Sequence, residues 1–99
     1  VQLYSVEDIS NLFDSCSKLI SIDLSVFEKS NITYMEGTFS NCDSLEIINF
    51  GNINTSFVRN MSSLFYRCKS LTSVNLSNFM FNNLPTVLAS FILYIRSPI

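Results

Sequence analysis

The chain has no histidine and no tryptophan, and it has only two glycines and two prolines in 99 residues. Without histidine it lacks the commonest general base and the commonest neutral metal ligand of proteins. Only 14% of its residues are charged, and the net charge is -2. Nucleic acids and anionic membranes are bound through clustered lysine and arginine, whereas the six basic residues here are scattered. These shortages argue against nucleic acid as a partner.

The chain also lacks a long apolar run. Its longest one, residues 91–95 extended by residues 87–90, is well short of the roughly twenty residues that span a bilayer. No basic segment followed by an apolar one is visible at the start of the sequence, so the chain shows no signal peptide. We therefore expect no transmembrane span.

What the chain does have is a repeat with a period of 26 residues. Three residue types recur in register and form what we call the core ladder: Phe13, Phe39, Phe65 and Phe91; Cys16, Cys42 and Cys68; and Leu19, Leu45 and Leu71. The units are residues 1–26, 27–52 and 53–78, followed by a partial unit, 79–99. A fixed period in this range predicts one solenoid domain of stacked units, none of which can bury its apolar face alone.

Each unit combines two hydrophobic periodicities. Residues 61–71 have apolar side chains three and four positions apart, which predicts a short helix that Asn60 or Ser62 caps. Residues 71–76 then approach strict alternation, which predicts a short strand. The expected fold is therefore α/β, with short parallel strands on one side of the solenoid and short helices on the other.

These spacings also support a family resemblance. The run NMSSLFYRCKSLTSVNLSNF, residues 60–79, resembles the BspA-like leucine-rich repeat, whose Met, Leu-Phe, Cys and Ser-Leu features fall here on Met61, Leu64, Phe65, Cys68, Ser70 and Leu71. The resemblance covers residues 1 to about 91 and ends where Val87 replaces Met, Tyr94 replaces Cys and Pro98 falls at the next strand. It implies a bacterial or protist surface protein that adheres to host or matrix proteins, at the cell surface or outside it.

The column of three cysteines has two interpretations. The cysteines could form disulfides or a metal site, or they could be buried, reduced thiols. Zinc ligands usually occur as local pairs, and the three cysteines are 26 residues apart. Helices pack about 8 to 10 Å apart, beyond the roughly 7 Å that a disulfide spans between Cα atoms. On that reasoning we expect free thiols in the core, no metal site and no cofactor.

The asparagine-rich composition produces sequons at Asn31, Asn54, Asn60 and Asn75. They are compatible with glycosylation of a secreted protein, but helix capping and turn formation explain Asn and Ser at such positions on local grounds. The eight carboxylates occupy different repeat phases, and no phosphate-binding loop is present, so we predict no catalytic residues and no enzyme.

The remaining candidate is the exposed side of the predicted sheet. If Ile22 and Leu24 point inward, alternation turns the neighbouring positions outward. The predicted surface comprises Ser21, Asp23, Ser25, Ile47, Asn49, Gly51, Ser73, Asn75 and Ser77. Helices wider than strands would make this surface concave, and solenoids bind partners on such surfaces. An alternative is that Asp23, Asn49 and Asn75 are merely solvated or hydrogen-bond one another along the stack.

Three functions remain open at this point. The first is a non-catalytic protein-binding module that binds a host or matrix surface protein through the concave face. The second is a structural spacer, and the third is an intracellular leucine-rich-repeat adaptor. Because the end units look uncapped, we also expect the array to stack with further repeats of a longer parent chain.

Overall fold

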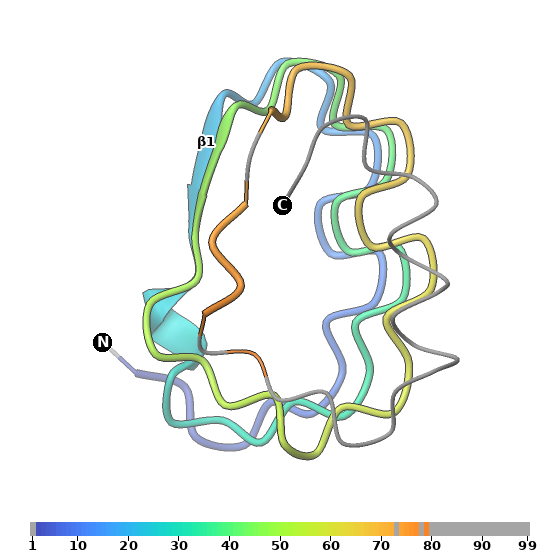
Figure 1. The fold of residues 1–99 in the computed structure, drawn as a ribbon. Helices are drawn as coiled ribbons and strands as arrows, with labels where there is room; N and C mark the ends of the chain where they lie inside the picture. The colour runs from blue at the N-terminus through green and yellow to red at the C-terminus, as the bar shows by residue number, and fades with distance from the viewer. Residues whose placement is uncertain (1, 73, 78, 80–99) are drawn as a thin grey trace.

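The computed structural model describes residues 2–72, 74–77 and 79, and the chain winds through them in successive coils that lie one on another (Figure 1). We call residues 2–26 coil 1, residues 27–52 coil 2 and the described residues from 53 onward coil 3. Strand β1 (Ser21–Asp23) lies in coil 1 and strand β2 (Ile47–Asn49) in coil 2. They pair in parallel, with Ser21 opposite Ile47 and Asp23 opposite Asn49. Residues 26 apart therefore lie side by side.

The same offset holds on the opposite side of each coil, where backbone hydrogen bonds join neighbouring coils. Parallel bridges connect Asp8 with Tyr34 and Tyr34 with Asn60. The N–H of Ile9 donates to the carbonyl of Tyr34 at 2.9 Å, and the N–H of Met35 donates to that of Asn60 at 2.9 Å. These N–H groups donate to the next coil, whereas those of Thr33 and Arg59 donate back to the preceding coil, at 2.7 and 2.8 Å.

The segments predicted to be helices are instead series of tight turns. Residues 62–67 are turns, and the described part of the chain contains no α-helix; its one helical element is the 3₁₀ helix η1 (Ser25–Phe27). In coil 1 successive N–H groups donate alternately within the coil and to the next coil. The N–H of Leu12 donates to the carbonyl of Ile9 in its own turn at 3.2 Å, and the N–H of Phe13 donates to the carbonyl of Thr38 in coil 2 at 3.0 Å. The helix prediction for residues 61–71 is therefore wrong.

Backbone conformation and coil spacing both explain the correction. Two columns adopt positive φ in every coil: Asn11, Gly37 and Ser63, and Ser15, Asn41 and Arg67. A left-handed residue at every fourth position stops an α-helix from propagating. Backbone hydrogen bonds also hold adjacent coils at about 4.8 Å, whereas α-helices with their side chains are about 10 Å wide. Consecutive turns fit that spacing.

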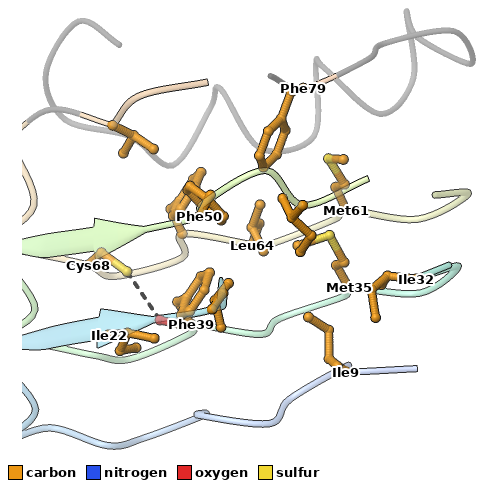
Figure 2. Close-up of a cluster of buried hydrophobic side chains, with 14 of the residues drawn as sticks. Ile9, Ile22, Ile32, Met35, Phe39, Phe50, Met61, Leu64, Cys68 and Phe79 are labelled. Carbon is orange, nitrogen blue, oxygen red and sulfur yellow. Dashed lines mark hydrogen bonds between the residues drawn. The ribbon is translucent and has the colours of Figure 1, made fainter. Parts of the chain in front are cut away.

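The core lies inside the stack and is formed by the repeated columns (Figure 2). Phe39 and Phe65 are completely buried, and the Phe39 ring stacks between Phe13 and Phe65 with centroids 6.0 Å from each. Phe50 packs edge-on against both Phe39 and Phe79. Figure 2 shows Ile9, Met35 and Met61 forming a second column beside these rings. Burial of such side chains stabilises a fold by about 1.5 to 3 kcal/mol each.

Two arguments made from the sequence assumed helices, and they no longer hold because turns take their place. Because turns stack as closely as strands, the spacing reason given against disulfides does not apply; the three cysteines are nevertheless free thiols. The predicted concavity also depended on helices wider than strands, so its cause is absent. We call the surface around β1 and β2 simply the strand face.

Candidate binding surface

The strand face contains most of the residues that the repeat places there. Ser21 and Asp23 in coil 1, Ile47 and Asn49 in coil 2, and Asn75 and Ser77 in coil 3 are exposed. Ser25 and Gly51, which follow β1 and β2, are half-buried. Ser73 lies outside the described residues. The structure therefore brings the predicted polar residues together on one surface, interrupted by Ile47, which is 60% exposed.

Each coil ends its strand segment with the same side-chain-to-backbone hydrogen bond. Oδ1 of Asp23 accepts the N–H of Ser25 at 2.9 Å, and Oδ1 of Asn49 accepts the N–H of Gly51 at 2.9 Å. In coil 3, Oδ1 of Asn75 accepts the N–H of Ser77 at 3.0 Å. These side chains therefore close turns within their own coils, rather than bonding to one another along the stack.

This turn fixes the chemistry that the column presents to solvent. With Oδ1 occupied, the Nδ2 groups of Asn49 and Asn75 remain as outward donors. Asp23 instead presents a carboxylate, and the backbone N–H of Ser25 holds the pKa of this carboxyl below its ordinary value of 3.8. The face thus offers one anionic acceptor in coil 1 and amide donors in coils 2 and 3.

Gly51 is required where coil 2 leaves the strand face. Its φ is 59°, a conformation that favours glycine. A Cβ atom at this position would meet the carboxylate of Glu28. That carboxylate accepts the N–H of Asn52 at 2.6 Å and so joins the beginning of coil 2 to its end.

A small cavity of about 210 Å³ lies on the strand face between coils 2 and 3. It is lined by Ile48, Asn49, Phe50, Gly51, Asn75, Ser77 and Phe79. Sequence reasoning missed the apolar wall formed by Phe50 and Phe79, because it considered only the outward positions of the predicted strands. The cavity combines an aromatic wall with two amides and is sized for one side chain or a similarly small group.

The core ladder lies mostly inside the stack. Phe39, Cys42 and Leu45 of coil 2 have no exposed surface, and Phe65, Cys68 and Leu71 of coil 3 are also buried. Their counterparts Phe13, Cys16 and Leu19 in coil 1 are half-buried. Phe91 lies outside the described residues.

The thiols of Cys42 and Cys68 are buried and hydrogen-bonded to the preceding coil. Cys42 Sγ donates to the carbonyl of Phe13 at 3.2 Å, and Cys68 Sγ donates to that of Phe39 at 3.1 Å, which Figure 2 shows as a dashed line. Burial raises the pKa of Cys42 to about 11 and that of Cys68 to about 12. Because the thiolate is the nucleophile, such thiols are chemically inert at neutral pH.

The sequon asparagines take part in local turns. Oδ1 of Asn54 accepts the N–H of Ser56 at 3.0 Å, and Oδ1 of Asn60 accepts that of Ser62 at 2.8 Å. Asn75 bonds in the same way on the strand face. The Asn-x-Ser spacing therefore has a structural cause at these positions, and it is the sequence signal from which the turns could have been found.

Other kinds of site were also considered within residues 2–72, 74–77 and 79. No group of three or more His, Cys, Asp or Glu side chains there is arranged to hold a metal ion. That part of the chain also contains no helix of a length and hydrophobicity suited to crossing a membrane. The strand face is thus the main candidate for binding.

Comparison with known proteins gives one family. Residues 2–92 match the family described as "Mycoplasma protein of unknown function, DUF285". No curated protein and no solved structure matches the chain.

Proposed function

The chain belongs to the DUF285 family, and we propose that it is a non-catalytic protein-binding module that acts through its strand face. More specifically, we propose that it is part of a BspA-like leucine-rich-repeat surface protein with an adhesive role at the cell surface. The resemblance of residues 60–79 to that repeat supports this assignment.

We further propose that the coils form a leucine-rich-repeat-type solenoid in which turns replace helices on the side opposite the strands. The parallel register between β1 and β2 supports it, since each residue pairs with the one 26 positions later. The bridges from Asp8 through Tyr34 to Asn60 give the same offset on the other side. Such stacks supply extended surfaces for protein partners.

The observation that carries the proposal is the column of turn-closing side chains on the strand face. Their exposed amides are held in fixed orientations beside the 210 Å³ cavity, so a partner with hydrogen-bond acceptors loses little entropy in ordering them. Exposed Ile47 and the aromatic wall of the cavity add apolar contact, which protein interfaces combine with polar groups.

The test must change the outward groups without breaking the turns. In the double variant Asn49→Asp, Asn75→Asp, each new carboxylate keeps an acceptor for the following N–H, as Asp23 does, but replaces the outward donor with an anion. The charge-matched control is Asn11→Asp, Asn31→Asp, since both asparagines are exposed and lie off the strand face.

Beads coated with each protein are applied to an epithelial cell layer and to the matrix that the cells leave behind. We expect the strand-face variant to lose most adherence, the control to retain it, and both to keep the parent's melting temperature within a few degrees. Equal adherence of both variants would favour the structural spacer. Adherence of neither variant nor the parent would favour an intracellular adaptor.

A further inference from the structure

The parallel sheet ends at β2, although the chain continues into coil 3. Among the described residues the sheet has two strands, which belong to coils 1 and 2. Backbone bonds between these coils also extend past the strands at both ends. The N–H of Glu46 donates to the carbonyl of Ile20 at 2.8 Å before the strands, and the N–H of Leu24 donates to that of Asn49 at 2.8 Å after them.

The corresponding bonds between coils 2 and 3 are absent. At an offset of 26 residues, the N–H of Thr72 would donate to the carbonyl of Glu46, and the N–H of Phe50 to that of Asn75. Neither bond is present within residues 2–72, 74–77 and 79. On the opposite side, N–H groups of coil 2 still donate to coil 3 at 2.7 to 3.1 Å. In Figure 1 the orange trace of coil 3 accordingly runs apart from the overlapping traces of coils 1 and 2 at the strands.

Side-chain burial at β2 agrees with this interruption of the backbone ladder. Ile22 in β1 is 7% exposed, whereas its counterpart Ile48 in β2 is half-buried. The order is reversed in the core ladder, where Phe39 of coil 2 is more deeply buried than Phe13 of coil 1. We call the carbonyl of Glu46 and the N–H of Phe50, which flank β2 on the side of coil 3, the free edge of β2.

The cavity of about 210 Å³ lies beside this free edge. Coil 2 contributes Ile48 and Phe50 to its wall, and coil 3 contributes Asn75, Ser77 and Phe79. A cavity of about 150 Å³ with apolar walls holds a benzene molecule, so this one has room for one large apolar side chain. None of the residues that line it is charged. The cavity therefore suits an uncharged occupant with an apolar body.

We propose that the free edge of β2 binds an extended segment of a partner protein, which adds to the sheet as a third strand and places one large apolar side chain in the cavity. The N–H of Phe50 donates to a carbonyl of the segment, and the carbonyl of Glu46 accepts one of its N–H groups. An extended backbone supplies donors and acceptors at the spacing of a strand, and its alternate side chains point toward one face. Ile47, which is 60% exposed, adds apolar contact next to the segment. The inference rests on the proposed function, because it specifies the partner's chemistry at the strand face.

The test measures the free edge with a probe peptide and the whole 99-residue chain. The probe is acetyl-Lys-Thr-Val-Thr-Phe-Thr-Val-Thr-Lys-amide, and solvent exchange of backbone N–H groups is followed by NMR. At a peptide concentration ten times the Kd, we expect exchange of the Phe50 N–H to slow about tenfold, because exchange then proceeds from the small unbound fraction. The N–H of Leu24, which is already bonded to Asn49, is the internal control and should not change.

Two N-methylated probes separate backbone pairing from apolar contact. One carries N-methyl groups on phenylalanine and both valines, and the other on the two threonines that flank phenylalanine. Their side chains are the same, but each lacks donors on a different edge of the extended peptide. Because only one edge faces β2, we expect one isomer to bind about tenfold or more weakly than the other.

A pair of protein variants tests the cavity. Ile48→Phe places a larger side chain in the cavity, whereas Ile20→Phe makes the same change at an exposed residue that does not line it. We expect the first to weaken peptide binding by about tenfold or more and the second to bind as the parent does. Melting temperatures within a few degrees of the parent's show that both variants fold; if Ile48→Phe does not, the N-methylated probes decide.

Three results would overturn the proposal: no slowing at Phe50 with the probe, equal binding of the two N-methylated probes, or equal binding of the two folded variants. A Phe50 N–H as protected as that of Leu24 without peptide would also overturn it, by showing that coil 3 pairs with β2. Slowing that follows protein concentration alone would do so by showing a second copy at the edge. Adherence is a separate readout: if adherence depends on Asn49 and Asn75 but the probe does not bind, the proposed function stands and this inference fails.

Discussion

Coils 1 and 2 carry the same ladder residues but differ in their neighbours. Phe39 and Cys42 have a coil on each side and no exposed surface, whereas Phe13 and Cys16 have a coil on one side and are half-buried. Side-chain type and phase are identical in the two coils. The difference shows that burial in this fold depends on the stack and not on the individual residue.

The comparison also separates two kinds of hydrogen bond. Those between coils depend on neighbours, as in the N–H of Phe13 donating to Thr38. Those within a coil do not, as in the turns closed by Asp23 and Asn49. Coil 1 therefore keeps its own turns, although no described N–H group donates to the carbonyls of Asp8, Ser10, Leu12 and Asp14. The predictions below use this division, starting with the change that depends most on neighbouring coils.

The largest difference is expected between Phe39→Ala and Phe13→Ala. Phe39 is completely buried between two rings, so its truncation should lower the free energy of unfolding by about 3 to 5 kcal/mol. Phe13 loses one stacking partner and less buried area, so we expect roughly 1 to 2 kcal/mol. Urea unfolding of both variants measures the two costs, and equal costs would contradict the account.

A smaller loss is expected for Thr38→Val, which keeps the shape of the side chain and removes its hydroxyl. Thr38 is buried, and its Oγ1 lies 3.1 Å from the carbonyl oxygen of Ile9 in coil 1 and 2.8 Å from that of Met35 in coil 2. We expect the free energy of unfolding to fall by about 1 kcal/mol. Thr72→Val is the control on an exposed residue and should change stability by less than about 0.5 kcal/mol.

The buried thiols predict a loss of stability in alkali. Burial raises the pKa of Cys42 to about 11 and that of Cys68 to about 12, from an ordinary value of 9.0. The folded protein therefore keeps protons that the unfolded chain releases above pH 9, so their stabilising effect is complete below that pH and is lost through pH 11 to 12. Melting temperatures of the parent and Cys68→Ala between pH 7 and 11 measure it. A variant as alkali-sensitive as the parent would show that Cys68 does not contribute.

The smallest effect concerns the acidic turns of coil 1. Backbone N–H groups of Ser10 and Ser25 lower the pKa values of Asp8 and Asp23, so these carboxylates stabilise the fold at neutral pH and this stability is lost as the pH falls through their folded pKa values. In Asp8→Asn, Asp23→Asn each turn keeps an acceptor. We expect a slightly lower melting temperature than the parent's at pH 7 and a smaller decrease between pH 5 and 2. Identical melting profiles of parent and variant in acid would contradict this role of Asp8 and Asp23.

The sequence was sufficient to place the columns but not to define the backbone between them. The 26-residue register predicts that Phe39, Leu45 and Leu71 share one interior, and all three are buried there. Spacings of three and four, however, are common to a helix and to consecutive turns, so they did not distinguish the two. Gly37 and Asn41, which tolerate positive φ, were the available signals for turns.

The sequence likewise predicted only part of the candidate surface. Alternation placed Asp23, Asn49 and Asn75 outside, where the structure has them. Their turn-closing role follows from the N–H two residues later, which period-two reasoning ignores. The apolar wall of the cavity depends on how Phe50 and Phe79 of adjacent coils meet, and no single unit specifies that contact.

The central claim is that residues 26 positions apart lie side by side throughout the stack. Nuclear Overhauser effects measured on protein with labelled phenylalanine rings test it most directly. The account predicts contacts from Phe39 to both Phe13 and Phe65, and none between Phe13 and Phe65. A direct contact between Phe13 and Phe65, or a Phe39 ring with neither neighbour, would contradict it.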